Sequence, residues 1–315
     1  MSQENSLEND TSQIVPVASV LRKSRWRWRT FAIAALAIAI LAIMGRFGDI
    51  ANEKGEAQIA RIIIEDIILT DAKRLKIINE LGEKDNVKAV IIAINSPGGT
   101  TAGGEELFEA ISNLREKKPV VAVIHEVGAS AAYMSAIATD RIFARRLSIV
   151  GSIGVLFSHV NMGEMFDKIG IDFDKVQSGP LKAEPDIDDP LSGKTRESLQ
   201  SLINDSYNWF VDIVADRRSL SRSKTLNLAD GRILTGRMAL KAGLIDEIGS
   251  EKEAIAWLEK TKEIEADLPV KTIFPLPEDD LEKILRYVGS SISDSIGLKS
   301  NPATLDGLVS IWQTN

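Results

Sequence analysis

The chain contains no cysteine and only two histidines, His125 and His159, among its 315 residues. The absence of cysteine excludes a thiol nucleophile and any zinc or iron-sulfur site built from thiolates. A Ser-His-Asp triad would need one of the two histidines as its base. We interpret both as core or edge residues hydrogen-bonded to the backbone, so another residue type has to be considered as a base.

Acidic residues outnumber basic ones in this chain, 45 to 38. The formal net charge is −7, and 44% of the residues are hydrophobic and 26% charged. Because nucleic-acid recognition needs a basic face, the composition argues against a nucleic-acid partner. The hydrophobic content can fill one large core, and no internal repeat is present, so a single folded module is expected.

Basic residues gather before residue 30, directly ahead of the apolar run from Phe31 to Met44. The cluster consists of Arg22, Lys23, Arg25, Arg27 and Arg29, interleaved with Trp26 and Trp28. This pattern is typical of a membrane segment with its N-terminus in the cytoplasm. A cleaved signal peptide is the alternative, but the leader is long and hydrophilic and no small-x-small site follows Met44. We therefore expect an uncleaved single-pass anchor with the body outside the cytoplasm.

The predicted organisation has five parts. They are a cytoplasmic basic leader (1–29), a transmembrane anchor (30–47), a tether (48–58), a folded domain (59–262) and a C-terminal extension (263–315) that is either mobile or an oligomer contact.

Strand and helix patterns alternate within the folded domain. Strands are predicted at Ala60–Leu69, Val87–Ile94, Val120–Ile124, Arg141–Ala144 and Phe173–Val176. Helices are predicted from Asp71 to Gly82, from Ser130, from Lys194 to Leu220 and from Glu251 to Lys262. The continuous apolar run Val87–Ile94 is typical of a strand buried on both faces. The alternation predicts an α/β fold of βα units around a largely parallel sheet.

Two of these strands run into residues that carry chemistry. Asn95–Gly99 follows the first strand, and its glycines allow a turn with outward N–H groups, as an oxyanion hole needs, although such a segment is more often an ordinary turn. Ser130 follows the second strand and begins a helix, where free N–H groups favour developing negative charge. A plain N-cap serine is the alternative.

Lys182 lies in a loop bounded by Gly179, Pro180 and Pro185. A lysine that acts as a base has to lose its proton, which requires burial or nearby positive charge. Most lysines are solvated charges, so the residues alone leave both readings open. Three aspartates follow, but nothing near them completes a metal site, and we expect a solvated loop with no metal or cofactor. They are Asp186, Asp188 and Asp189.

Several motifs, in order and at matching spacing, resemble signal peptide peptidase A in its short, single-module form across roughly residues 58–262. They are Asn95–Gly99, Gly128–Ser130, Gly151–Val155, Ser178–Lys182 and the pair Ala229–Gly236 and Gly243–Gly249. The resemblance implies an α/β protein of the Clp-protease/crotonase superfold with an N-terminal transmembrane helix. It also implies that the domain is a serine endopeptidase.

Carried over residue by residue, the resemblance makes Ser130 the nucleophile and Lys182 the general base. Ser152 would be the hydroxyl that orients the lysine, and ranks second as a nucleophile because it lacks the strand-to-helix position. Gly99 and Ala131 would supply the oxyanion-hole N–H groups. The family usually has two glycines after the nucleophile, whereas this chain has alanines, which affects the shape of the specificity pocket.

The resemblance further implies substrates, partners and a location. The substrates would be signal-peptide remnants and other short apolar peptides, with no cofactor. The partners would be the lipid bilayer and neighbouring copies in a ring-shaped homo-oligomer such as an octamer, in which serine and lysine come from adjacent protomers. The location would be the bacterial cytoplasmic (inner) membrane, with the catalytic domain on the extracytoplasmic, or periplasmic, side. Two alternatives remain: a crotonase-type acyl-CoA enzyme and a catalytically silent membrane scaffold.

Overall fold

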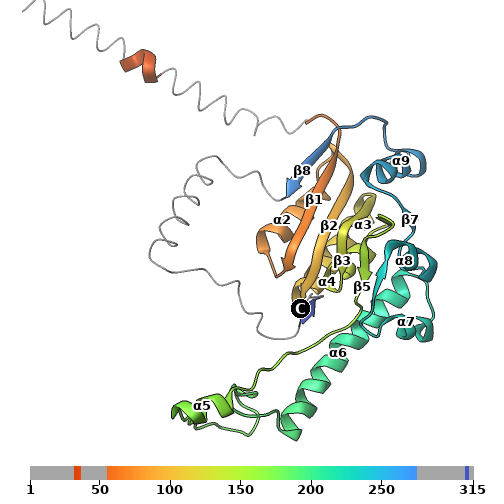
Figure 1. Cartoon of the computed structure of the whole chain (residues 1–315). Coiled ribbons are helices and arrows are strands. Elements are labelled where there is room, and N and C mark those ends of the chain that lie inside the picture. The colour runs from red at the N-terminus through yellow and green to blue at the C-terminus, as the bar shows by residue number, and fades with distance from the viewer. Residues whose placement is uncertain (1–31, 37–54, 275–308, 312–315) are drawn as a thin grey trace, which may run out of the picture. The chain divides into compact units, whose positions relative to one another are not determined.

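The computed structural model of the chain describes residues 32–36, 55–274 and 309–311 (Figure 1). The chain divides into two compact units, Met1–Glu56 and Ala57–Asn315. In the first unit only the helical residues 32–36 are described. The predicted leader, most of the predicted anchor and most of the tether lie outside the described residues. Within the ranges that are described, no helix combines the length and the apolar character that crossing a membrane requires.

The second unit alternates strands and helices, as the sequence predicts. The strands are β1 (Gln58–Ile68), β2 (Val87–Thr100), β3 (Val120–Ala129), β4 (Arg141–Ala144), β5 (Ile149–Gly151), β6 (Ile233–Thr235), β7 (Glu247–Ile248), β8 (Val270–Phe274) and β9 (Val309–Ile311). The helices are α2 (Ala72–Leu81), α3 (Thr101–Lys117), α4 (Ala131–Ile137), α5 (Gly163–Ile169), α6 (Gly193–Arg217), α7 (Arg222–Leu228), α8 (Gly236–Ala242) and α9 (Glu251–Thr261).

These strands form one sheet with the main order β6-β5-β3-β2-β1-β8, and β4, β7 and β9 pair off this path. Neighbouring strands are parallel except in the pairs β5–β6 and β2–β9. The α/β fold with a largely parallel sheet is therefore confirmed. Because β8 pairs with β1, the sheet continues past residue 262, the expected end of the folded domain.

The central strands are buried on both faces, and their side chains alternate between two cores. In β2, Val90 and Ile92 belong to a large core with residues of α2, α3, α4 and α6. Ile91, between them, belongs to a smaller core on the opposite face with Ala254 and Leu258 of α9. Each fully buried aliphatic side chain contributes about 1.5–3 kcal/mol. This burial explains why the run Val87–Ile94 carries no polar residue other than Lys88.

Two predicted boundaries and one predicted strand differ from the structure. The first boundary is in β2, which continues from Ile94 to Thr100 because β1 still pairs with it at Gly98 and Gly99. The second is in β3, which likewise runs on from Ile124 to Ala129, beside β5. The predicted strand Phe173–Val176 is wrong. These residues are exposed and have no strand assignment, and they lie between α5 and α6 without pairing to any described strand.

Candidate active site

Ser130 lies at the junction between β3 and α4. Its φ of 58° and ψ of −122° belong to a region that residues with a side chain rarely adopt, at a cost of about 1–3 kcal/mol. Its N–H donates to the carbonyl oxygen of Gly151 at 2.8 Å, and its own carbonyl accepts from the N–H groups of Tyr133 and Met134 at 2.9 and 3.1 Å. The hydroxyl does not cap α4. Ser130 is therefore the N-cap residue of α4 by position, but its side chain does not serve as the cap.

Helix α4, which Ser130 precedes, is buried along its whole length. The phenol of Tyr133 donates to the carbonyl oxygen of Leu244 at 2.7 Å, and burial raises the pKa of Tyr133. Helix α3 packs closely against α4 because it presents Gly104, where an added Cβ would lie 2.7 Å from the sulfur of Met134. Ala131 and the next alanine are fully buried. Their methyl groups therefore pack in the core, and this packing holds in place the helix that follows the turn at Ser130.

Ser152 follows β5, the neighbour of β3. Ala129 and Gly151 are paired in these parallel strands, so Ser130 and Ser152 both come directly after a matched pair. Ser152 also has a positive φ, of 50°, and its N–H donates to the carbonyl oxygen of Arg232 at 2.9 Å. It is 8% exposed. The structure therefore brings the two predicted site serines to the same end of adjacent strands.

Gly99 lies within β2 and not in the turn that the sequence predicts. It is paired with Ile68 of β1, and a Cβ at Gly99 would lie 1.9 Å from the Ile68 carbonyl oxygen, which no side chain can tolerate. The hydroxyl of Ser96 donates to the carbonyl oxygen of Asp66 and accepts from the N–H of Gly98 at 3.1 Å. Helix α4 packs against β2. The predicted oxyanion residues Gly99 and Ala131 thus belong to elements in contact.

The sheet forks beside these residues. β2 and β3 pair as far as Ser96 and Gly128, while the other edge of β3 pairs with β5 from Val127 to Ala129, after which the chain enters α4. The edge of Gly98–Thr100 that faces away from β1 is occupied instead by β9, which runs antiparallel to it. No pattern in the sequence predicts this pairing, since β9 lies in the predicted extension.

Lys182 is placed differently from the two serines. It lies between α5 and α6, in an arm (residues 152–192) that leads away from the sheet toward the N-terminal end of α6 (Figure 1). Its N–H donates to the carbonyl oxygen of Gly179 at 3.0 Å, which fixes a local turn, and its side chain is exposed. Ser130 is only 1% exposed. The single chain therefore leaves the predicted base on its surface.

The same arm exposes many large apolar side chains. Those that are at least 44% exposed are Leu156, Val160, Met165, Ile169, Ile171, Phe173, Val176, Leu181 and Ile187. Phe166 and Phe173 contact each other with ring centroids 5.0 Å apart, and Lys175 forms ion pairs with Glu184 and Asp186. The arm thus has internal order, while its apolar surface lacks a cover within the described part of this chain.

One of the two histidines, His159, and one of the three aspartates, Asp186, have side-chain partners in the structure. Nε2 of His159 lies 2.7 Å from the carbonyl oxygen of Asp186, as expected of a residue hydrogen-bonded to the backbone. His125 is half-buried within β3. Asp186 pairs with Lys175, as described above. Across the described residues, no three His, Cys, Asp or Glu side chains are grouped so that they could hold a metal ion.

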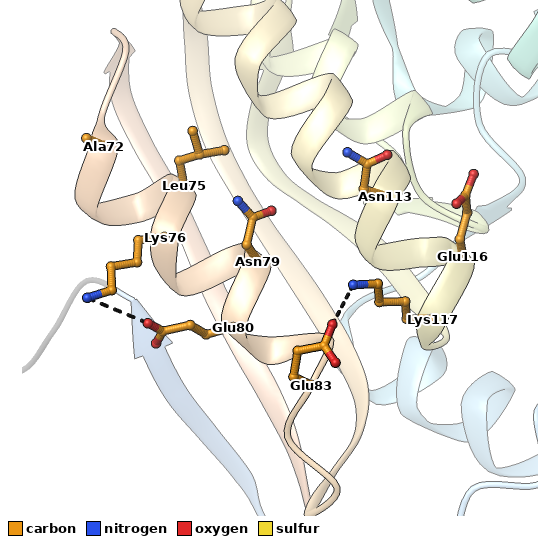
Figure 2. A pocket seen from close by; sticks show the side chains of 9 residues that line it. All are labelled: Ala72, Leu75, Lys76, Asn79, Glu80, Glu83, Asn113, Glu116 and Lys117. Atoms are coloured by element: carbon orange, nitrogen blue, oxygen red, sulfur yellow. Dashed lines mark hydrogen bonds and ion pairs between the residues drawn. The ribbon is translucent and has the colours of Figure 1, made fainter.

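Two cavities lie along α3, at its opposite ends. One, of about 280 Å³, is beside the candidate site and is lined by Thr101, Met134 and Trp209, together with the exposed carboxylates Glu105 and Asp205. Composition and spacing did not predict it, because α6 contributes part of the wall. The other, of about 790 Å³, lies between α2 and the end of α3 and is bordered by the ion pairs Lys76–Glu80 and Lys117–Glu83 (Figure 2).

Comparisons with known proteins identify the family. Residues 112–265 match the family model described as peptidase family S49. The chain is 32% identical over 281 residues to "Putative protease MJ0651" of Methanocaldococcus jannaschii, covering 84% of this chain and 90% of that protein. It is 32% identical over 259 residues to "Serine protease SPPA, chloroplastic" of Arabidopsis thaliana, covering 80% of this chain and 37% of that protein.

The chain belongs to peptidase family S49, a family of serine proteases. The resemblance to signal peptide peptidase A is thereby confirmed. Among solved structures, the chain is similar to a ClpP1 mutant from Listeria monocytogenes, with 17% identity, a TM-score of 0.41 and coverage of 61% of this chain and 92% of that one. This similarity is weak, and the α/β assignment rests on the sheet and helices described above.

Proposed function

We propose that the chain is a membrane-anchored serine endopeptidase that cleaves signal-peptide remnants and other short apolar peptides. Ser130 is the nucleophile, Lys182 the general base and Ser152 the hydroxyl that orients the lysine. The N–H groups of Gly99 and Ala131 form the oxyanion hole. The observation that carries the proposal is the backbone of Ser130, strained at a strand-to-helix junction beside Ser152.

In this mechanism the oxygen of Ser130 attacks the carbonyl carbon of the scissile peptide bond while the neutral amine of Lys182 takes the hydroxyl proton. The carbonyl oxygen becomes an oxyanion, which the N–H groups of Gly99 and Ala131 stabilise. Lys182 then donates the proton to the leaving amine, and an acyl-enzyme remains on Ser130. Water, deprotonated by Lys182, hydrolyses the ester and releases the second peptide.

We infer that Lys182 acts on the serine of a neighbouring copy of the chain. Two observations support this arrangement. Lys182 is exposed on an arm outside the body, and that arm exposes nine large apolar side chains, a grouping typical of an interaction surface. A head-to-tail contact of this kind closes into a ring when the rotation between neighbours allows it. The ring-shaped homo-oligomer, for example an octamer, accounts for both features.

The anchor, the extracytoplasmic location and the substrate class belong to the same proposal. The basic cluster with tryptophans before the run Phe31–Met44 supports a single-pass anchor in a bacterial inner membrane with its N-terminus in the cytoplasm. Signal-peptide remnants are apolar and are found in the membrane, where an anchored protease meets them. Cleavage in spheroplasts tests the location: externally added protease should degrade the body without lysis.

Labelling with a fluorophosphonate is the direct test of the serine. The reagent should modify Ser130 in the full chain, and mass spectrometry of the digested protein should locate it there. Ser130→Ala should remove the label, whereas Ser152→Ala should retain it. A chain whose Ser130 stays unmodified while the protein is folded would favour the silent scaffold. A crotonase-type acyl-CoA enzyme would likewise need no reactive serine at this junction.

A further inference from the structure

The turn between β4 and β5 presents its two central side chains to solvent on a fixed backbone. The N–H of Ser148 donates to the carbonyl oxygen of Arg145 at 3.2 Å, and the hydroxyl of Ser148 accepts from the N–H of Arg145 at 3.0 Å. The same hydroxyl donates to the carbonyl oxygen of His125 in β3. These bonds close a four-residue turn with Arg146 and Leu147 at its centre, both exposed. The turn therefore holds an arginine and a large apolar side chain in solvent.

The start of α8 packs directly on this turn. The N–H of Arg237 donates to the carbonyl oxygen of Arg146 at 3.2 Å. Gly236 lies so close that an added Cβ would be 2.1 Å from the carbonyl oxygen of Arg145. Arg237 and Lys241 are four residues apart in α8, so they lie on one face of it, and both are exposed. The two segments together form a patch of four cationic and two apolar side chains, which we call the basic patch: Arg145, Arg146, Leu147, Arg237, Met238 and Lys241.

The cations of the basic patch are not neutralised by nearby carboxylates. Within the part of the chain that the structure describes, no ion pair involves any of the four. The acidic residues that flank α8, Asp230 and Asp246, pair instead with Arg232 and Arg218. Glu126, on the neighbouring strand β3, is exposed and forms no ion pair with the patch. Since the whole chain has a net charge of −7, this local excess of positive charge favours an anionic partner.

The two apolar side chains indicate which kind of anion the basic patch fits. Leu147 and Met238 lie among the cations and are 72% and 50% exposed. A small soluble anion has no use for apolar contacts. At a membrane surface, in contrast, large apolar side chains enter the interface while long Arg and Lys side chains reach the lipid phosphates. The combination therefore favours a lipid surface.

We propose that the basic patch docks the folded body on the surface of a membrane that contains anionic phospholipids. Leu147 and Met238 enter the headgroup region, and the four cations bind phosphate groups. This inference goes beyond the proposed peptidase activity, because docking requires neither Ser130 nor Lys182. It rests on the proposed anchor only in that an anchor keeps the body close to lipid. Since the backbone of the turn is already fixed, docking orders side chains alone.

The absence of cysteine allows a single fluorophore to be placed on the basic patch. Met238→Cys in the full chain, labelled with a polarity-sensitive dye, is reconstituted into vesicles of equal parts phosphatidylglycerol and phosphatidylcholine, or of phosphatidylcholine alone. The emission should shift to the blue in the anionic vesicles only. Salt at about 1 M should reverse the shift, because the Debye length then falls to about 3 Å. The same dye on Asn79→Cys, an exposed position of α2, should show no shift.

Charge variants of the labelled chain test which cations dock. A basic residue near an anionic surface contributes about 1 kcal/mol, which is about fivefold in the docking equilibrium. Replacing three of them should therefore lower that equilibrium about 100-fold and remove the shift. The three substitutions are Arg145→Gln, Arg146→Gln and Arg237→Gln. The matched control removes the same number of exposed charges elsewhere and should retain the shift; its substitutions are Lys73→Gln, Lys84→Gln and Lys88→Gln.

Three outcomes would overturn the proposal. The first is equal emission of labelled Met238→Cys in both kinds of vesicle, and the second is an equal loss of the shift in the control charge variant. In the third, soluble polyglutamate produces the shift and vesicles do not, which would identify an acidic protein segment as the partner. A peptidase assay on the same samples reports separately on the proposed function: absent hydrolysis with the shift retained would contradict that function alone.

Discussion

The backbone N–H of Ser130 and the carbonyl oxygen of Gly151 are joined by a hydrogen bond of 2.8 Å. This bond ties the turn before α4 to the end of β5, so Ser152, the next residue of the chain, is held in a fixed relation to Ser130. Both serines have positive φ values. The turn at Ser130 is therefore tied to the end of β5 and the turn at Ser152 to the carbonyl oxygen of Arg232, so the backbones of both serines are held in place.

Removing either member of the proposed dyad should abolish hydrolysis. Catalytic units of this type lose about 10⁴- to 10⁶-fold in rate when one member is removed, so Ser130→Ala and Lys182→Ala should each fall by that order. Ser152→Ala should lose less, because it removes an orienting hydrogen bond. Initial rates on a peptide substrate measure the effect, with circular dichroism to check folding. Activity of either variant within about tenfold of the parent would exclude the dyad.

Mixing inactive protomers should restore activity if the site is shared. When Ser130→Ala and Lys182→Ala chains are co-expressed, some interfaces combine an intact serine from one protomer with an intact lysine from its neighbour. We expect partial recovery of hydrolysis in the mixed oligomer and none in either variant alone. Mixed oligomers that assemble and stay inactive would show that both residues act within one chain.

Gly99→Ala should destabilise the protein as well as inactivate it. The new methyl group would meet the backbone of Ile68, which cannot move away like the end of a side chain. Overpacking of this kind costs about 1–3 kcal/mol, and more where backbone is involved. Gly193→Ala is a matched control, since nothing lies within 4 Å of the added Cβ at the start of α6. In urea unfolding, only Gly99→Ala should have a lower free energy of unfolding than the parent protein.

Alkaline pH should weaken the stabilisation that the buried phenol of Tyr133 gives to α4. Burial raises the pKa of Tyr133 above its unfolded value, which is about 10, so the folded state retains the phenol proton. The resulting stabilisation is complete below pH 10 and is lost as the pH rises above it. Tyr133→Phe removes the hydrogen bond to Leu244 and should cost about 1–2 kcal/mol at pH 8. The difference between the two proteins in urea unfolding should shrink at pH 11; an unchanged difference would contradict the assignment.

Local patterns in the sequence predicted most of the regular structure. The helices predicted at Lys194–Leu220 and Glu251–Lys262 are observed at Gly193–Arg217 and Glu251–Thr261, because each has a clear start and an apolar face. The strand Val87–Ile94 was recognisable from its continuous apolar run. Its extension to Thr100 was not, since a Pro-Gly-Gly sequence is extended here only because β1 pairs alongside it.

The site was predictable where neighbours in sequence are neighbours in space. Ser130 stands out because a strand, a serine and small residues follow one another directly. The pairing of β3 with β5 that aligns Ser152 depends on long-range register, so the residues themselves gave no sign of it. The exposed position of Lys182 was not predictable either. Loop residues such as Gly179 and Pro180 indicate a turn, but they do not indicate which part of the protein lies next to that turn.

The fork in the sheet also limits which conformations of a bound polypeptide can pair with its open edge. Past the last pair of β2 and β3, the edge of Gly98–Thr100 forms a wall of backbone N–H and C=O groups, with which β9 pairs. A helix, with a diameter of about 10–12 Å and its own hydrogen bonds already made, cannot satisfy that wall. Only a polypeptide that has lost its secondary structure can align there. If this edge binds substrate as proposed, folded proteins are excluded by the backbone geometry alone.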